Sequence, residues 1–226
     1  MKSKFLLGAL AATAALLVSG GAFAQSAGSI VVYGGGTQIN PQVESGDLTA
    51  PSLAGTKVDV KKASSFVGGV TYYWTDNISI DLPVLAVPFK HDVVGAGAIE
   101  GVGKLGTVKA LPITVLGQYR FGDANSTLRP FVGAGVTYGY FFKPKSTAVL
   151  SGITGGTASN PTTLSMKSRF GTTMELGAAY NVTKDWSASL SLTKTFIKTT
   201  GSLSTGQTIE TTLDPVSVKF VVGYRF

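Results

Sequence analysis

Apolar side chains recur at every second position in eight separate segments of this chain. Successive side chains of a β-strand point to opposite faces, so this period predicts strands with one apolar and one mixed face. The clearest case runs from Trp186 to Thr193, where apolar residues alternate with Ser and Thr. The eight segments cover residues 29–37, 64–74, 78–89, 108–121, 129–142, 168–180, 186–193 and 214–226.

The connections between these segments alternate between short and long. The short ones are rich in Asp, Asn and Gly, as turns require, and they span residues 75–77, 122–128 and 181–185. The long ones span residues 38–63, 90–107, 143–167 and 200–213. Membrane barrels have short turns on the periplasmic side and long loops outside. The pattern therefore predicts an all-β fold, an eight-stranded antiparallel up-and-down transmembrane β-barrel.

The amino terminus has the three parts of a secretory signal peptide. Lys2 and Lys4 precede an apolar run over residues 5–18, and the small-x-small sequence Ala-Phe-Ala follows at residues 22–24. The run of 14 residues is too short for a transmembrane helix, which needs about 20. We therefore expect a cleavable signal peptide over residues 1–24, with the barrel formed by the remainder, residues 25–226.

The composition restricts the chemistry that the chain can carry. The absence of Cys excludes disulfides and thiolate metal sites, and His91 is the only histidine. Enzymatic barrels that edit lipid A use a histidine with a serine and a carboxylate, but no recognisable serine motif follows His91. We therefore expect no enzymatic activity, no metal and no cofactor.

Aromatic and charged residues favour a membrane barrel over a soluble sandwich with an aromatic core. The aromatic residues gather at the two ends of the strands, where the headgroup levels of a bilayer would lie. The mixed faces carry eight charged residues: Asp81, Lys109, Arg120, Arg129, Arg169, Glu175, Lys219 and Arg225. An eight-stranded barrel is only wide enough inside for side chains, and buried ions need partners. We expect these charges to form a polar network that fills the lumen.

The last strand ends the chain with an alternating apolar row. Phe220, Val222, Tyr224 and the terminal Phe226 lie on one face. This row resembles the carboxy-terminal signal of bacterial outer-membrane barrels, which the barrel-assembly machinery reads. The resemblance implies localisation in the outer membrane of a Gram-negative bacterium.

Several segments resemble the outer-membrane protein W (OmpW) family, which includes alkane-uptake barrels. The matching segments are residues 86–92, 111–115, 118–119, 129–135, 214–215 and 222–226. Lys194 departs from the pattern, because it lies on an otherwise apolar face. The resemblance implies an extracellular hydrophobic pocket from which a small apolar molecule passes sideways through the wall into lipid.

The long connections are less polar than surface loops usually are, which points to a groove or an interaction surface. By resemblance, the residues expected to line part of the pocket are Leu53, Val93, Val94, Ile99, Leu105 and Leu111. The expected function is passive uptake of small hydrophobic molecules. The alternatives are that these loops only pack on one another, or that the barrel is a structural or surface-interaction protein without transport.

Lysines in or beside the long connections predict an anionic partner. They are Lys57, Lys61, Lys62, Lys90, Lys104, Lys143, Lys145 and Lys167. An exported protein seldom meets nucleic acid, so the expected partners are outer-membrane lipids, including the lipid A phosphates of lipopolysaccharide.

Overall fold

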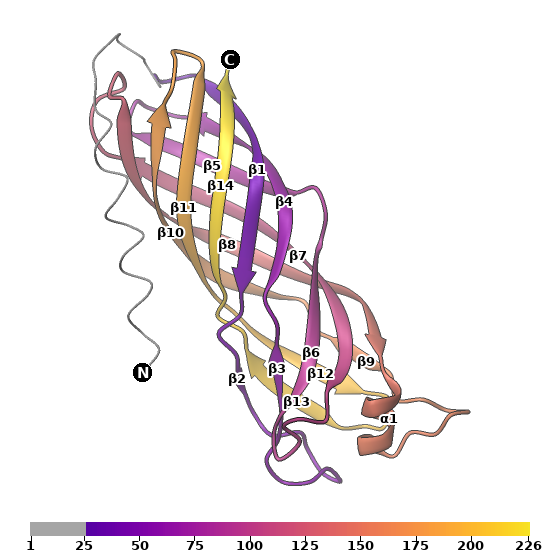
Figure 1. The fold of residues 1–226 in the computed structure, drawn as a ribbon. Coiled ribbons are helices and arrows are strands. Elements are labelled where there is room, and N and C mark those ends of the chain that lie inside the picture. Colours follow the sequence, from indigo (N-terminus) through magenta and orange to yellow (C-terminus); the bar gives the residue numbers. More distant parts are fainter. Residues whose placement is uncertain (1–25) are drawn as a thin grey trace, which may run out of the picture.

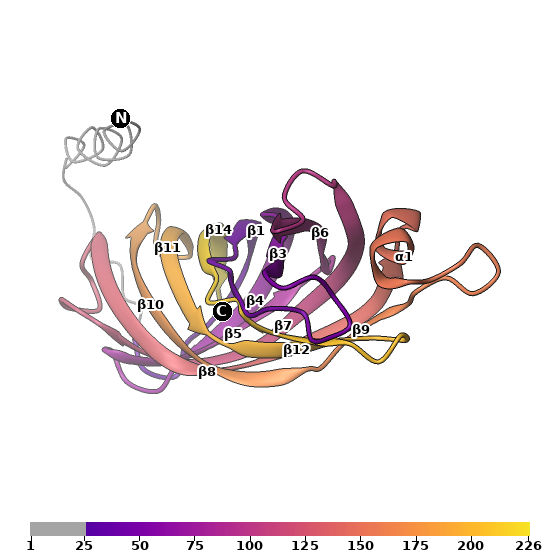
Figure 2. The same cartoon turned by 90° about the horizontal axis from the view of Figure 1, so that it is seen from below.

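The computed structural model describes residues 26–226, so the predicted signal peptide lies outside the described residues. Eight antiparallel strands form a closed barrel, as predicted (Figures 1 and 2). The barrel strands are β1 (Ile30–Asn40), β4 (Ala63–Tyr73), β5 (Ile78–Leu85), β7 (Lys104–Arg120), β8 (Leu128–Ser146), β10 (Arg169–Asn181), β11 (Trp186–Phe196) and β14 (Val216–Arg225). Each pairs with its neighbour in this order, and β14 pairs with β1 to close the barrel.

The long connections are structured, although the sequence predicted them as loops. They contain β2 (Glu44–Ser45), β3 (Thr56–Val60), β6 (Phe89–Gly97), α1 (Ala148–Thr154), β9 (Leu164–Met166), β12 (Lys198–Leu203) and β13 (Thr208–Thr212). Strands β3 and β6 extend the wall beyond the barrel, while β2, β13, β12 and β9 form a second small sheet. All of them lie at the end opposite the carboxy terminus (Figure 1).

The predicted strand over residues 78–89 is in fact divided. β5 ends at Leu85, and β6 begins at Phe89 and continues into the segment that was predicted as a loop. Pro88 lies in the interruption. Proline cannot donate a backbone hydrogen bond to a neighbouring strand, which explains why the regular strand stops there.

The outer and inner faces have opposite character. Phe66 and Phe170 on the outside are each 73% exposed, while Arg129 is fully buried and Asp81 is 2% exposed. A soluble protein buries its apolar side chains, whereas a membrane barrel turns them toward lipid and encloses the polar ones. Among the described residues, no helix is long and apolar enough to cross a membrane.

Two adjacent glycines of β1 show how closely the strands approach inside the barrel. Gly35 pairs with Val221 of β14, and a Cβ atom on Gly35 would overlap the carbonyl oxygen of Phe220. A Cβ on Gly36, the next residue, would meet no atom within 4 Å. The seam that closes the barrel therefore tolerates a side chain at residue 36 but not at residue 35.

We predict that Gly35→Ala lowers the free energy of unfolding by about 1–3 kcal/mol, because overpacking forces the two backbones apart. Gly36→Ala is the matched control and should change it little. The measurement is urea unfolding in lipid vesicles, followed by the different gel mobilities of folded and unfolded barrels. Equal effects of the two substitutions would contradict the prediction.

Candidate functional site

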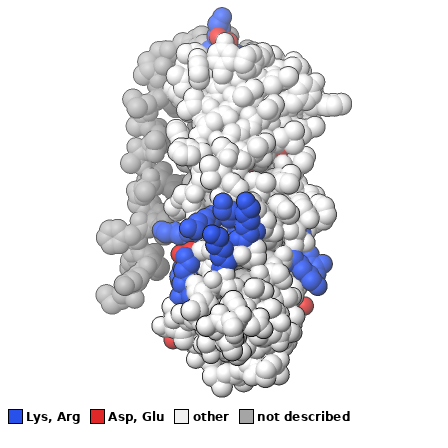
Figure 3. Space-filling view, turned by 90° about the vertical axis from the view of Figure 1, so that its right-hand side faces the viewer, with Lys and Arg blue, Asp and Glu red and all other residues white. Residues whose placement is uncertain are grey.

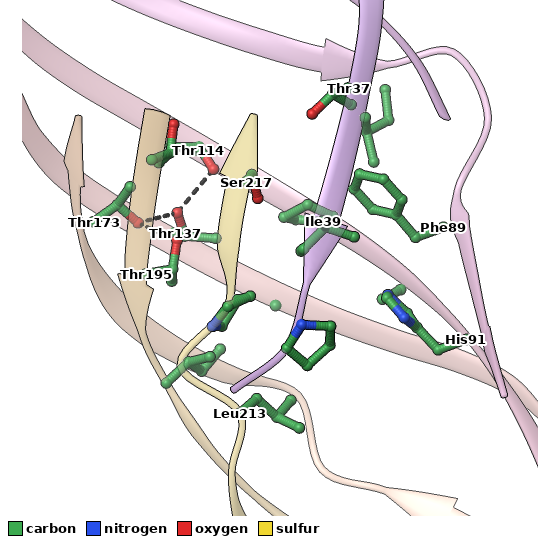
Figure 4. A pocket seen from close by; sticks show the side chains of 18 of the residues that line it. Thr37, Ile39, Phe89, His91, Thr114, Thr137, Thr173, Thr195, Leu213 and Ser217 are labelled. Carbon is green, nitrogen blue, oxygen red and sulfur yellow. Dashed lines mark hydrogen bonds between the residues drawn. The ribbon is translucent and has the colours of Figure 1, made fainter. Parts of the chain in front are cut away.

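An apolar cavity of about 130 Å³ lies inside the barrel at the end that carries the long connections. Its wall includes Phe89 and His91 of β6, Val108 and Ala110 of β7, and Ile39 of β1. Figure 4 shows Ile39, Phe89, His91 and Leu213 pointing into the same space. Other apolar lining residues are Val60, Val67, Leu85, Leu116, Phe141, Ile197 and four prolines, Pro41, Pro83, Pro112 and Pro215.

Threonine hydroxyls form the polar side of this cavity. Thr114 and Thr137 are direct partners on β7 and β8, and their hydroxyl oxygens are 2.8 Å apart. The hydroxyl oxygen of Thr137 is 2.6 Å from that of Thr173 on β10. The hydroxyl oxygen of Thr173 is in turn 3.0 Å from that of Thr195 on β11. A hydroxyl both donates and accepts, so this row satisfies its own hydrogen bonds across four strands (Figure 4).

A buried ion cluster lies next to the threonine row, on the side of the short turns. The Lys219 ammonium is 3.3 Å from Asp81 Oδ2 and 3.2 Å from Glu175 Oε1. Asp81 also accepts hydrogen bonds from the hydroxyls of Thr71, at 2.7 Å, and Tyr33, at 3.2 Å. The charges are thus paired and hydrogen-bonded, which is the condition under which a buried ion is tolerated.

Arg120 and Gln118 of β7 extend this cluster toward the short turns. Gln118 donates to Glu175 Oε2 at 2.7 Å and accepts from Arg120 at 2.8 Å. The Arg120 guanidinium lies over the rings of Tyr73 and Phe131, at 5.1 and 4.6 Å from their centres. We call Asp81, Gln118, Arg120, Glu175 and Lys219 the lumen network. A small cavity of about 30 Å³ remains beside it.

His91 forms an uncharged part of the wall of the apolar cavity. Its Nδ1 is 2.8 Å from the carbonyl oxygen of Lys61, and its ring lies against Phe89 with 5.9 Å between ring centres. His91 pairs with Val108 beyond the exposed apolar rows of the barrel. Burial lowers the pKa of His91, so the ring is neutral at pH 7.

The wall beside the cavity lacks part of its backbone ladder. β5 pairs with β7 from Ile78 to Asp81, and pairing with β7 resumes only at Phe89 of β6. Residues 82–88 and 111–115 therefore have no pairing with each other, and we call this stretch the wall gap. It contains three prolines, and two of them, Pro83 and Pro112, line the cavity. A backbone without its ladder separates more easily than one with it.

The structure brings together part of the charged set expected in the lumen. Arg129 is buried near the short turns, and Arg225 is half-buried. Lys109 and Arg169 are exposed. Lys109 lies four residues before the exposed Ile113, so the regular alternation of β7 places both side chains on the outer face. Its neighbours Val108 and Ala110 are buried.

None of the six residues expected around the pocket lines the apolar cavity. Ile99 and Leu105 pack in a buried cluster with Leu48, Leu150, Leu203 and Ile209. Val93 is also buried, and Val94 and Leu111 are partly buried. Leu53 is 67% exposed. The apolar side chains of the long connections mainly pack against one another.

Sequence reasoning missed the threonine row and the wall gap. Thr114, Thr137 and Thr173 fall on the inward faces of three successive predicted strands, which is the signal that could have revealed the row. The expected assembly signal lies on β14 and the residue that follows it, with Phe220, Val222 and Phe226 exposed and Tyr224 half-buried. Within residues 26–226, no group of three or more His, Cys, Asp or Glu residues could hold a metal ion.

We predict that Lys219→Met lowers the free energy of unfolding by about 3–5 kcal/mol, because Asp81 and Glu175 are left buried without a counter-charge. A triple variant that combines Lys219→Met with Asp81→Asn and Glu175→Gln should regain much of the lost free energy of unfolding. Lys198→Met, at an exposed lysine of β12, is the control. Urea unfolding in vesicles measures all of them, and a triple variant less stable than Lys219→Met would refute the pairing argument.

Comparisons with known proteins agree with this architecture. The model of the OmpW family matches residues 26–226. Outer membrane protein W of Escherichia coli (strain K12) is 34% identical over 227 residues, covering 99% of each chain. The dibenzothiophene metabolism operon protein PahQ of Pseudomonas aeruginosa is 27% identical over 146 residues, 63% of each chain. The crystal structure of the outer membrane protein OprG from Pseudomonas aeruginosa superposes with a TM-score of 0.78 and 26% identity, covering 89% of this chain and 97% of that one. The chain therefore belongs to the OmpW family of outer-membrane β-barrels.

Proposed function

We propose that this barrel lets small hydrophobic molecules cross the outer membrane passively, through the apolar cavity and the wall gap into lipid. The observation that carries the proposal is the position of the cavity. It is closed toward the short turns by the threonine row and the lumen network, and it adjoins the stretch of wall without backbone pairing. The remaining route for an apolar molecule is sideways.

The energetics favour this route over passage along the barrel axis. An apolar molecule gains about 25 cal/mol for each Å² of surface that leaves water, in the cavity or in lipid alike. Crossing the lumen network would require breaking the ion pairs of Lys219 and exposing them to an apolar surface. Because cavity and lipid offer similar apolar surroundings, moving from the cavity into lipid costs the molecule little free energy.

The comparisons and the sequence support the remaining parts of the proposal. The name of PahQ places that protein in an operon for the metabolism of dibenzothiophene, an apolar aromatic compound. For this chain, we propose export by the signal peptide over residues 1–24 and recognition of the last strand by the barrel-assembly machinery. Neither step involves a cofactor, and no reaction is catalysed.

We predict that Ala110→Phe, which places an aromatic ring inside the cavity, reduces uptake to the level of a deletion strain. Ala110 lines the cavity and is 8% exposed. The measurement is the initial uptake rate of a fluorescent hydrophobic tracer by cells that carry the variant. Ala134→Phe is the matched control, because Ala134 is exposed on the outer face of the neighbouring strand β8.

Gel mobility of the folded form shows that each variant reaches the membrane as a barrel. Unchanged uptake in the folded Ala110→Phe variant would contradict the proposed route. Equal uptake by the deletion strain and the complemented strain would instead support the alternative of a structural or surface-interaction barrel.

The wall gap can be tested separately because the chain has no cysteine. Leu85, a half-buried residue in the gap, lines the cavity. We predict that Leu85→Cys supports uptake until a bulky maleimide is attached, and that labelling then slows uptake. Val136→Cys, at an exposed position of β8, is the control. Uptake that is insensitive to a fully labelled Cys at residue 85 would exclude the lateral exit.

A further inference from the structure

Three exposed lysines lie side by side on the outer surface, just past the apolar rows. Lys90 is on β6, Lys109 on β7 and Lys143 on β8, and we call them the lysine cluster. Figure 3 shows Lys and Arg side chains gathered at mid-height on this face, with mostly uncharged surface above and below. Their strands are neighbours in the sheet.

The strand register brings these positive charges together at the edge of the membrane-facing surface. Lys90 is the direct cross-strand partner of Lys109, and Lys109 is opposite Phe142, the residue before Lys143. Phe142 stacks on Tyr140 with 5.2 Å between ring centres. Aromatic residues of this kind mark the headgroup level of a bilayer. The lysine cluster is therefore at the depth of lipid headgroups.

No acidic side chain neutralises the lysine cluster. Other exposed lysines have their own partners: Lys57 pairs with Asp47, Lys61 with Asp59 and Lys104 with Asp92. Over residues 26–226, the lysine cluster takes part in no ion pair with a carboxylate. Like charges directly opposite one another destabilise a sheet. Three uncompensated lysines on adjacent strands thus form a site for an external anion.

A bulge in β8 accompanies the exposure of Lys143. Between the pairs Thr107–Lys145 and Lys109–Phe142, two residues of β8 lie opposite the single residue Val108 of β7. Lys143 has a φ of 46°, in the left-handed region that residues other than glycine seldom adopt. Strict alternation from the exposed Tyr140 would place Lys143 on the inner face, yet it is exposed. Departures of this kind cost free energy and occur mostly at functional sites.

We propose that the lysine cluster binds the phosphate groups of an anionic lipid in the outer leaflet, a diphosphorylated headgroup of the lipid A type. Ammonium groups attract phosphate as point charges, and three of them match a headgroup that carries more than one phosphate. The apolar rows next to the cluster, with Ile113 and Tyr140 exposed, would contact the acyl chains. This site rests on the orientation of the barrel in the outer membrane and does not depend on transport.

The test compares two triple variants of the full barrel that remove the same charge. Lys90→Gln, Lys109→Gln and Lys143→Gln together remove the lysine cluster. The control combines Lys57→Gln, Lys61→Gln and Lys198→Gln, at exposed lysines elsewhere on the long connections. Native mass spectrometry of the barrel in neutral detergent gives the affinity for diphosphoryl lipid A, for the dephosphorylated lipid and for inorganic phosphate.

We expect the cluster variant to bind diphosphoryl lipid A at least about tenfold more weakly than the wild type, because each lysine near a lipid surface contributes separately. The control should bind about as tightly as the wild type, and the dephosphorylated lipid should bind weakly to both. Unchanged affinity of the cluster variant, or an equal loss in the control, would overturn the site. Displacement of the lipid by inorganic phosphate would show a free-anion site and overturn the lipid assignment. Uptake of the hydrophobic tracer, measured in parallel, tests the transport proposal independently.

Discussion

Lipid offers no hydrogen-bond partner to a peptide group, and the rest of this structure depends on that constraint. The sheet satisfies it by closing on itself, with β14 paired to β1 along ten residue pairs. Closure fixes which face each side chain takes, because the register leaves one row outside and the next inside. The wall gap is an exception to backbone pairing, and its prolines, including Pro83 and Pro112, lack the amide hydrogens that would otherwise be unpaired.

The interior follows from the same closure. Eight strands enclose a space that side chains can fill, and the inward positions carry Lys219, Asp81 and Glu175 close enough to pair. Apolar residues line the lumen toward the long connections, so one lumen contains a polar half and an apolar cavity. Under the proposed function, a ligand that enters from outside would meet a change of polarity at the threonine row. That change in polarity would direct the ligand sideways.

The strands and their orientation could be predicted because period and connection length are local properties of a sequence. Residues 214–226 show this, since Val218, Phe220 and Val222 are exposed on β14 as their alternation predicted. The cavity could not be found in this way. Whether Ile99 faces a ligand or packs on Leu105 depends on contacts among connections that are distant in the chain. Periodicity does not reveal a bulge either, and the bulge in β8 leaves Lys143 exposed although strict alternation from Tyr140 would turn it inward.

Strand β7 links the three features of the loop end. Its regular alternation buries Val108 and Ala110 toward the cavity and turns Lys109 outward beside Lys90. A few residues farther along β7, the ladder to β5 is missing. One strand thus supplies the cavity wall, an edge of the wall gap and the centre of the lysine cluster. An anionic lipid held at the lysine cluster would lie beside the wall gap, so headgroup binding and lateral exit would act on the same segment of β7.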